Sequence, residues 1–387
     1  MPSKKNYEIA VILPSMYQFL YEVMEGVLAI RGVRHHCNFR HFLLNEEHDK
    51  VDFPKGYQPD GAIVSYNDDS EDRVQWLFGL QIPIVNVFNS TNPIHPSVFT
   101  SPESLAKVIV EHFITLQFEE IGVLSTAELT LCDPVSEHIK SLCEQQNVPT
   151  WEIPVSDDNN HQDFRKLSTE APTLKDKLTD RTTRCGIYTT HDARGRLLAD
   201  YCAELGVSVP DKIGILGRFD SIHARLSTPE LSSLAVPARE IGEQAIQLLI
   251  GLIEKKVDLN EHIAIDIKEI RVRESTIGKD NTDLAILKAR QMIREQSTRG
   301  ITVDEIVQSM PMARSTFEKR YRALTGAAPA QDIRNFRQNA ARELLLTTSL
   351  SVEDISLKVG FTDPRPFVVF FKREAGLTPG EFRKTYK

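Results

Sequence analysis

The hydrophobic pattern of this chain changes once, near residue 282, and that change constrains the fold more than any other feature. Before it, short apolar runs rich in β-branched residues alternate with amphipathic stretches; after it, only helical periodicity remains. Strands that alternate with helices predict parallel sheets with helices on both faces. A chain of 387 residues is also too long for one ordinary core. The sequence therefore predicts an α/β region followed by an all-α region.

The α/β region extends to about residue 275, and its length suits two lobes. The predicted strands are 7–13, 61–65, 82–87, 120–125, 185–189 and 213–216, and the predicted helices are 17–30, 104–116, 194–205 and 238–254. Small and polar residues then interrupt the periodicity, which indicates a linker at 276–283. We therefore expect one domain at 1–275 and a second at 284–387.

Two segments of the all-α region look alike when Phe317 is aligned with Phe367. Each pattern predicts a short helix, a turn of a few residues, and a second helix with aromatic residues on its inner side. This is the helix-turn-helix layout, in which the second helix enters the major groove of DNA. A helix predicted at about 330–346 separates the two units. A rigid spacer of this kind suits recognition helices in consecutive major grooves, roughly 34 Å apart.

Capping signals mark where these helices begin. Thr302 precedes the first short helix, and Ser351 stands three residues before Asp354 at the start of the second. Asp363 followed by Pro364 predicts the first residues of the second recognition helix.

The charge of the chain is divided unevenly. Residues 284–387 hold 18 Lys and Arg against 11 Asp and Glu, whereas residues 1–283 hold 28 against 43. A basic segment attached to an acidic body suggests a module that binds a polyanion. The alternative is a basic face that is merely solvated.

Residues 301–384 resemble the AraC-type DNA-binding domain. The matching residues are Gly360-Phe361, Phe367, Phe371-Lys372-Arg373, Gly376, Thr378-Pro379 and Phe382-Arg383. The resemblance implies that the partner is double-stranded DNA at an operator or promoter. The candidate DNA-contacting residues are Arg314, Ser315, Thr316, Lys319, Arg320, Asp363, Arg365 and Lys372.

The second recognition helix departs from the family pattern. Val369 stands where a basic residue is common, and Pro366 removes a backbone donor. We therefore expect the second helix to depend more on packing and phosphate contacts. The first helix is the better candidate for direct readout, since a residue such as Arg314 can bond to guanine N7 and O6. Lys372 and Arg337 are candidates for phosphate contacts.

Residues 7–275 resemble the sugar-binding core of LacI/GalR-type regulators and type I periplasmic binding proteins. The matching stretches include PDGAIV at 59–64, TTHDAR at 189–194 and GVSVPDKIGI at 206–215. The resemblance implies two lobes that close on a small ligand, and a homodimer. It also implies a sugar effector, with a pentose such as xylose as the first candidate. The candidate effector-binding residues are Tyr17, Gln18, His191, Asp192, Phe219 and Asp220.

One motif of the α/β region departs from its family. The ligand-facing aspartate usually follows a strand as Gly-x-Asp, whereas this chain has Gly217-Arg218-Phe219-Asp220. Either a one-residue insertion restores Asp220 to the pocket, or Phe219 occupies the site. For Asp192, capping of the following helix is an alternative to ligand contact.

Other classes of protein fit less well. The sequence has no G-x-S-x-G, Walker lysine loop, H-E-x-x-H or GxGxxG after the first strand, so we predict no enzyme, cofactor or metal site. The five cysteines form no CxxC pair, which is typical of reduced thiols in a cytoplasmic protein. No secretory signal and no apolar run of about 20 residues is present. A regulator that responds to a non-sugar molecule and a solute-binding protein remain the alternatives.

Overall fold

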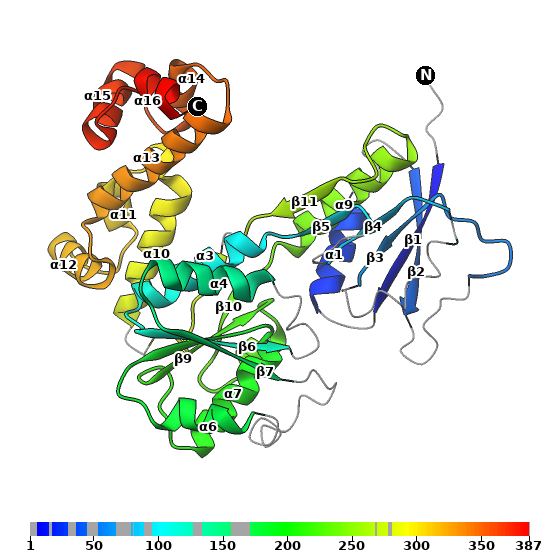
Figure 1. The fold of residues 1–387 in the computed structure, drawn as a ribbon, viewed down its shortest axis with the longest axis horizontal. Helices are drawn as coiled ribbons and strands as arrows, with labels where there is room; N and C mark the ends of the chain where they lie inside the picture. Colours follow the sequence, from blue (N-terminus) through cyan, green and yellow to red (C-terminus); the bar gives the residue numbers. More distant parts are fainter. Residues whose placement is uncertain are drawn as a thin grey trace. The chain divides into compact units, whose positions relative to one another are not determined.

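The chain forms two compact units, Met1–Thr276 and Ile277–Lys387 (Figure 1). The computed structural model describes residues 6–14, 18–29, 36–44, 53–66, 79, 81–88, 95–126, 134–155, 171–267, 269–277 and 281–386. Within these ranges, no helix combines the length and the apolar character needed to cross a bilayer.

The first sheet of the N-terminal unit has six parallel strands in the order β11-β5-β4-β3-β1-β2. These are β1 (Asn6–Pro14), β2 (His36–Leu44), β3 (Gly61–Val64), β4 (Ile84–Asn86), β5 (Ser97–Thr100) and β11 (His262–Ile265). Their centre is apolar and fully buried, as at Ile12 and Val64. Helix α9 (Ala238–Ile253) lies against this sheet, because Leu249 and Ile253 approach the position that a Cβ of Gly61 would take.

Helix α1 (Gln18–Leu28) contacts α9 through backbone atoms. A Cβ at Gly26 would lie 2.0 Å from the carbonyl oxygen of Arg239, and a Cβ at Gly242 would lie 2.0 Å from the carbonyl oxygen of Val23. A side chain at either position would force the helices apart. The two glycines therefore allow α1 and α9 to pack as one layer.

The second sheet has the order β12-β10-β9-β8-β6-β7, and only β12 runs antiparallel to its neighbour. Its strands are β6 (Glu120–Thr126), β7 (Thr150–Val155), β8 (Cys185–Thr189), β9 (Ile213–Arg218), β10 (Ser232–Ala235) and β12 (Glu269–Arg271). The helices of this lobe are α3 (Pro102–Thr115), α4 (Pro134–Gln145), α6 (Pro172–Thr179), α7 (Asp192–Glu204) and α8 (Ile222–Leu226).

The chain crosses between the two sheets three times. It passes from β5 through α3 to β6, from β10 through α9 to β11, and from β11 directly to β12. Two parallel sheets joined by three crossings confirm the predicted two-lobed α/β class. The crossings also bring the carboxyl ends of β9, β10 and β11 into one region, where a ligand of an open α/β sheet would bind.

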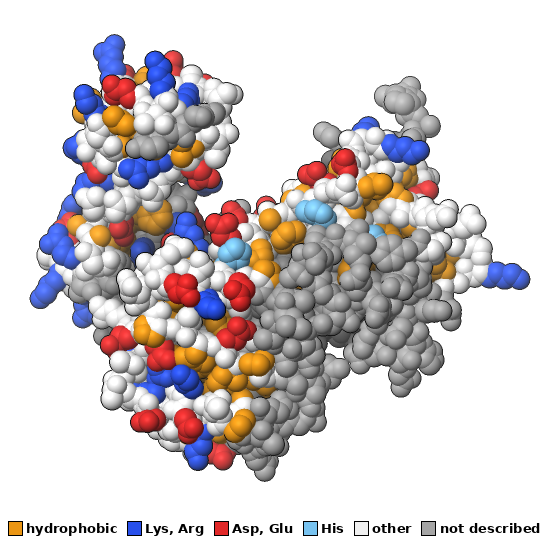
Figure 2. All heavy atoms as spheres, in the orientation of Figure 1, with side chains coloured by type: hydrophobic (Ala, Val, Ile, Leu, Met, Phe, Trp, Pro, Cys, Tyr) orange, Lys and Arg blue, Asp and Glu red, His pale blue; other side chains and the backbone are white. Residues whose placement is uncertain are grey.

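The C-terminal unit is entirely helical in its described residues. It contains α10 (Asn281–Gln296), η4 (Ser297–Arg299), α11 (Val303–Gln308), α12 (Arg314–Thr325), α13 (Pro329–Thr347), α14 (Val352–Lys358), α15 (Pro364–Ala375) and α16 (Pro379–Tyr386). Helix α10 begins within the predicted linker. Figure 2 shows Lys and Arg side chains spread over the visible face of this unit.

Two small cores divide the C-terminal unit, and α13 contributes to both. Ile333 of α13 packs in the first core with Phe317 and Tyr321 of α12. Further along α13, Leu345 packs in the second core with the phenylalanines of α15. Each core therefore supports one recognition helix, at opposite ends of α13 (Figure 1).

A close backbone contact joins the two halves of this unit. Gly360 has a φ of 85°, and a Cβ on it would lie 2.9 Å from the backbone nitrogen of Gly300 and from the carbonyl oxygen of Ser297. Arg337 of α13 donates to the carbonyl oxygens of Ser297 (2.7 Å) and Ile301 (3.3 Å). This joint, formed by Ser297–Gly300, Arg337 and Gly360, fixes one half against the other.

The predicted caps are confirmed. Thr302 and Ser351 both form reciprocal capping boxes, and the side chain of Asp363 accepts a bond from the backbone nitrogen of Arg365. Ala313 precedes α12 without a side-chain cap, as its sequence implies.

Candidate functional site

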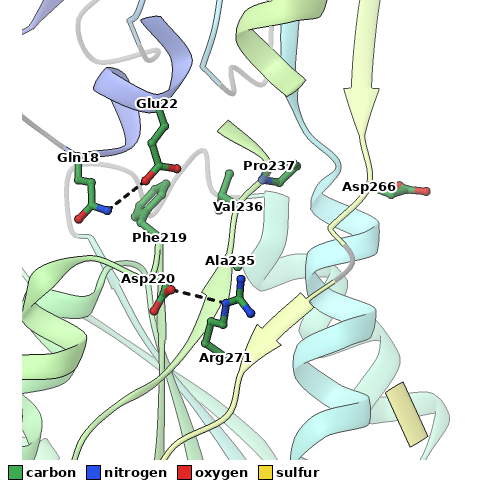
Figure 3. Close-up of a pocket in the computed structure, with 9 residues that line it drawn as sticks. All are labelled: Gln18, Glu22, Phe219, Asp220, Ala235, Val236, Pro237, Asp266 and Arg271. Atoms are coloured by element: carbon green, nitrogen blue, oxygen red, sulfur yellow. Dashed lines mark hydrogen bonds and ion pairs between the residues drawn. The ribbon is translucent and has the colours of Figure 1, made fainter. Parts of the chain in front are cut away.

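A pocket of about 380 Å³ lies in the N-terminal unit at the carboxyl ends of β9 and β10, beside the first turn of α1 (Figure 3). Its lining residues are Gln18, Glu22, Phe219, Asp220, Ala235, Val236, Pro237, Asp266 and Arg271. This volume is in the range that proteins use for small ligands, about 300–1,000 Å³. The lining combines carboxylates, one guanidinium, one amide and an aromatic ring.

Phe219 and Asp220, the two candidates for the Gly-x-Asp position, both line this pocket. Both residues have left-handed backbone conformations, with φ of 89° and 48°. Such a conformation is rare for a bulky side chain and is typical of functional turns. The ring of Phe219 lies 5.2 Å from that of Phe19 on α1, centroid to centroid, and 4.8 Å from the guanidinium carbon of Arg218. The turn after β9 thus presents an aromatic ring and a carboxylate side by side.

The carboxylate of Asp220 is held by two arginines. It lies 2.5 Å from a guanidinium nitrogen of Arg273 and 3.8 Å from one of Arg271. Arg273 also bonds to the carbonyl oxygen of Leu231 and lies 3.8 Å from Glu230. Asp220 is therefore held in a fixed orientation and is still partly exposed to the pocket, which suits it to accept bonds from hydroxyl groups.

The buried side chain of Asp192 stabilises the turn that contains Phe219 and Asp220. Its carboxylate accepts bonds of 2.6 Å from the hydroxyl of Ser233 and from the backbone nitrogen of Ser221, and its side chain fills the space above Gly217. Burial raises the pKa of Asp192 to about 6, although the two serine bonds lower it in part. Because this folded-state pKa exceeds the ordinary value, Asp192 contributes stability below about pH 4, and that contribution is lost as the pH rises through 6.

Two other residues of the TTHDAR stretch, His191 and Arg194, are not among the residues that line the pocket. His191, not Asp192, caps α7, because its Nδ1 accepts a bond of 3.2 Å from the backbone nitrogen of Arg194. The guanidinium of Arg194 is buried and donates to the hydroxyl of Thr190 (2.8 Å) and the carbonyl oxygen of Val155 (3.4 Å).

The structure thus brings three of the predicted effector residues together, namely Gln18, Phe219 and Asp220. Tyr17 lies outside the described residues. The sequence analysis missed Glu22, which is one helical turn after Gln18 and accepts a bond of 3.0 Å from its amide. Asp266, which follows the unpredicted strand β11, and Arg271, the last residue of the unpredicted strand β12, were also missed. The rule that ligands bind beyond strand carboxyl ends would have found Asp266 if β11 had been recognised.

No metal centre is evident in the described residues: no group of three or more His, Cys, Asp and Glu side chains is close enough to hold a metal ion. Among the residues that the structure describes, Cys37, Cys143, Cys185 and Cys202 are free and buried.

In the C-terminal unit, α12 presents a polar, basic face. Of the predicted residues on this helix, Arg314, Ser315, Thr316, Lys319 and Arg320 are all exposed. Arg314 forms ion pairs with Asp304 of α11 and, at 2.8 Å, with Glu318. Any contact of Arg314 with a base therefore requires exchange of these partners.

Helix α15 presents a different face. Arg365, Val369 and Lys372 are exposed on it, while Phe367 and Phe371 are fully buried. Asp363 is exposed and acts as the N-cap. Arg337, predicted to contact phosphate, is instead half-buried in the joint, where burial lowers its pKa.

Family models match both units of the chain. Residues 110–276 match a periplasmic binding protein-like domain, and residues 306–385 match a helix-turn-helix domain.

Several known proteins are similar to this chain. The xylose operon regulatory protein of Escherichia coli (strain K12) is 33% identical over 211 residues, 54% of each protein, so the match spans about half the length of that relative. A xylose operon regulatory protein of Haemophilus influenzae is 24% identical over 398 aligned positions, covering 98% of this chain and 99% of the relative. Among solved structures, that of a xylose-binding transcription activator, xylR, matches 99% of both chains with a TM-score of 0.55 and 23% identity.

The fold and the matches agree on the organisation of the molecule. The chain combines a two-lobed, periplasmic binding protein-like domain with an AraC-type helix-turn-helix domain, and it is similar along its length to xylose operon regulatory proteins.

Proposed function

We propose that this chain is a sequence-specific DNA-binding transcription regulator of a sugar-utilisation operon, controlled by a small sugar in the pocket of its N-terminal unit. The DNA-binding part of this proposal rests on the two exposed recognition helices, α12 and α15, which both pack against the single helix α13. At 1.5 Å per residue, the 19 residues of α13 span roughly 28 Å. This length is close to the separation of consecutive major grooves, about 34 Å.

The DNA-binding proposal predicts a steep dependence on salt. Cationic side chains on α12 and α15 would displace counterions from phosphates, so the logarithm of the association constant should fall linearly with the logarithm of salt concentration. The measurement is fluorescence anisotropy of the full chain with labelled duplex, after selection of a binding site from random DNA. Arg314→Ala should relax preference at one base pair, whereas Lys372→Ala should weaken all sequences nearly equally. Absence of binding at low salt would eliminate this function.

The pocket supports a sugar as the effector. A sugar ring has an apolar face that can stack on Phe219, and its hydroxyls can donate to the carboxylates of Asp220, Glu22 and Asp266. Two of the similar proteins are xylose operon regulatory proteins, and the similar solved structure is that of a xylose-binding transcription activator. We therefore propose a pentose ahead of a hexose, with xylose first.

Calorimetric titration with free monosaccharides tests the effector. Asp220→Asn should weaken binding of the best sugar by about ten- to a hundredfold, since a charged acceptor of a buried hydroxyl contributes about 1.5–3 kcal/mol. Glu230→Gln is the matched control, because Glu230 also approaches Arg273 but does not line the pocket. Phe219→Ala should also lose affinity. If no free sugar binds the wild type at millimolar concentration, the effector is a non-sugar molecule and the sugar assignment is wrong.

A pocket residue contacts the last residues of the N-terminal unit directly. Asp220 bonds to Arg273, which precedes Thr276, the last residue of the N-terminal unit, by three residues. A sugar hydroxyl that recruits Asp220 would compete with Arg273, so the effector can have different affinities for two arrangements of this segment. We further propose a homodimer that acts in the cytoplasm, where the operon DNA is found.

A further inference from the structure

One surface of the second recognition helix combines basic and apolar side chains. The exposed face of α15 consists of Arg365, Pro366, Val369, Lys372 and Arg373. Val369 lies at its centre and is 70% exposed, which is the largest exposure of any large hydrophobic residue that the structure describes.

The packing of α15 leaves Val369 outside the core. Asp363 caps the helix, and the rings of Phe367, Phe370 and Phe371 are buried beneath it. These anchors fix the rotation of the helix, so Val369 stays on the opposite side. The second core is complete without it.

A comparison of the two helix-turn-helix segments shows how the residue at position 369 differs from its counterpart in α12. With Phe317 aligned on Phe367, Val369 corresponds to Lys319 of α12, which is also exposed. The same point on the two recognition helices therefore carries a cation in the first half and a branched apolar side chain in the second. Arg365 and Lys372, which lie on either side of Val369 on this face, are basic.

The charge of this face favours DNA as its occupant. Arg365 and Lys372 stand four residues before and three residues after Val369, on the same side of the helix. Such cations can bond to the phosphates on either side of a groove, while the residue between them faces the base edges. In the major groove, thymine is the base that presents a methyl group, and apolar side chains recognise it by contact.

We propose that Val369 contacts the C5 methyl group of a thymine in the major groove, so that the half-site bound by α15 requires thymine at one position. This inference rests on the proposed DNA-binding function and specifies what the second recognition helix reads.

Removal of single methyl groups from the DNA tests this contact. Each thymine of the selected site is replaced in turn by deoxyuridine, and affinity for the full chain is measured. One replacement should weaken binding by about fourfold, the value of one buried methyl group. Val369→Ala should weaken binding to thymine DNA to a similar degree, and it should abolish the effect of deoxyuridine at that position. Such non-additivity identifies a direct contact.

Lys319→Ala provides the matched control on the first recognition helix. It should weaken binding, yet the effect of deoxyuridine in the second half-site should persist. If the wild type binds DNA but no thymine shows an effect that depends on Val369, the inference is wrong. The exposed face of α15 would then be expected to contact another protein. If the wild type selects no DNA sequence at all, the regulator proposal itself fails and this inference fails with it.

Discussion

Gly242→Ala is expected to lower the free energy of unfolding of the N-terminal unit by about 3 kcal/mol. The added Cβ would lie 2.0 Å from the carbonyl oxygen of Val23, which is a backbone atom that no rotamer change can move. Helices α1 and α9 would have to separate, and Gln18 and Glu22 would move with α1. Scanning calorimetry of the full chain should show a lower melting temperature for this unit, by roughly 6–10 °C. The transition of the C-terminal unit serves as the internal reference.

Gly251→Ala is the control in the same helix. The nearest atom to its added Cβ belongs to the side chain of Val257, which is partly exposed and follows the helix. Alanine there gains helix propensity, and its Cβ, 2.6 Å from a methyl carbon of Val257, displaces an exposed side chain and no backbone atom, so stability should change by less than about 1 kcal/mol. Equal losses for Gly242→Ala and Gly251→Ala would contradict a specific backbone contact between α1 and α9.

Gly360→Ala is expected to destabilise the C-terminal unit by about 2–4 kcal/mol and to weaken DNA binding by at least about tenfold. The left-handed backbone at Gly360 costs any other residue about 1–2 kcal/mol. The added Cβ would also meet backbone atoms of Ser297, Thr298 and Gly300 at 2.9–3.0 Å. The joint between the halves would open, so α12 and α15 would lose their fixed separation. Urea unfolding and DNA titration measure the two effects.

Gly326→Ala and Gly376→Ala isolate the contribution of the contact. These glycines have φ of 76° and 77°, close to that of Gly360, but no atom lies within 4 Å of their added Cβ. Each of these two variants should therefore lose only the roughly 1–2 kcal/mol that a left-handed backbone conformation costs alanine. A Gly360→Ala variant no weaker than these two would show that the joint contributes nothing.

Helix α9 and most helices of the C-terminal unit could be predicted from the sequence because their local signals agree. The pattern at 238–254 matches α9 within one residue, and the caps at Thr302, Ser351 and Asp363 mark true helix starts. Strands β2, β5, β7, β10, β11 and β12 were not predicted, and each of them lies at an edge of a sheet or next to an edge strand. Pairing across the fold, not local pattern, defines such strands.

The candidate pocket could be predicted only in part. Phe219 and Asp220 follow a buried strand, so their place at its carboxyl end was expected. The role of Asp192 could not be inferred, because it depends on Ser233, which is 41 residues away in the sequence. Arg337 looked like a surface cation, and only the tertiary fold places its guanidinium against the turn at Ser297.

Helix α10 is the element through which a displacement of the preceding chain would reach the C-terminal unit. It is the first helix after the N-terminal unit, and Ile286, Ala289 and Ile293 bury it in the same core as Phe317 of α12. Arg290 adds an ion pair to Asp332 at the start of α13. A twist applied at residue 281 would thus turn α12 directly and reach α15 only through α13 and the joint. A displacement of α10 would therefore reach the polar recognition helix through a shared core, and the apolar-centred one through the joint and α13.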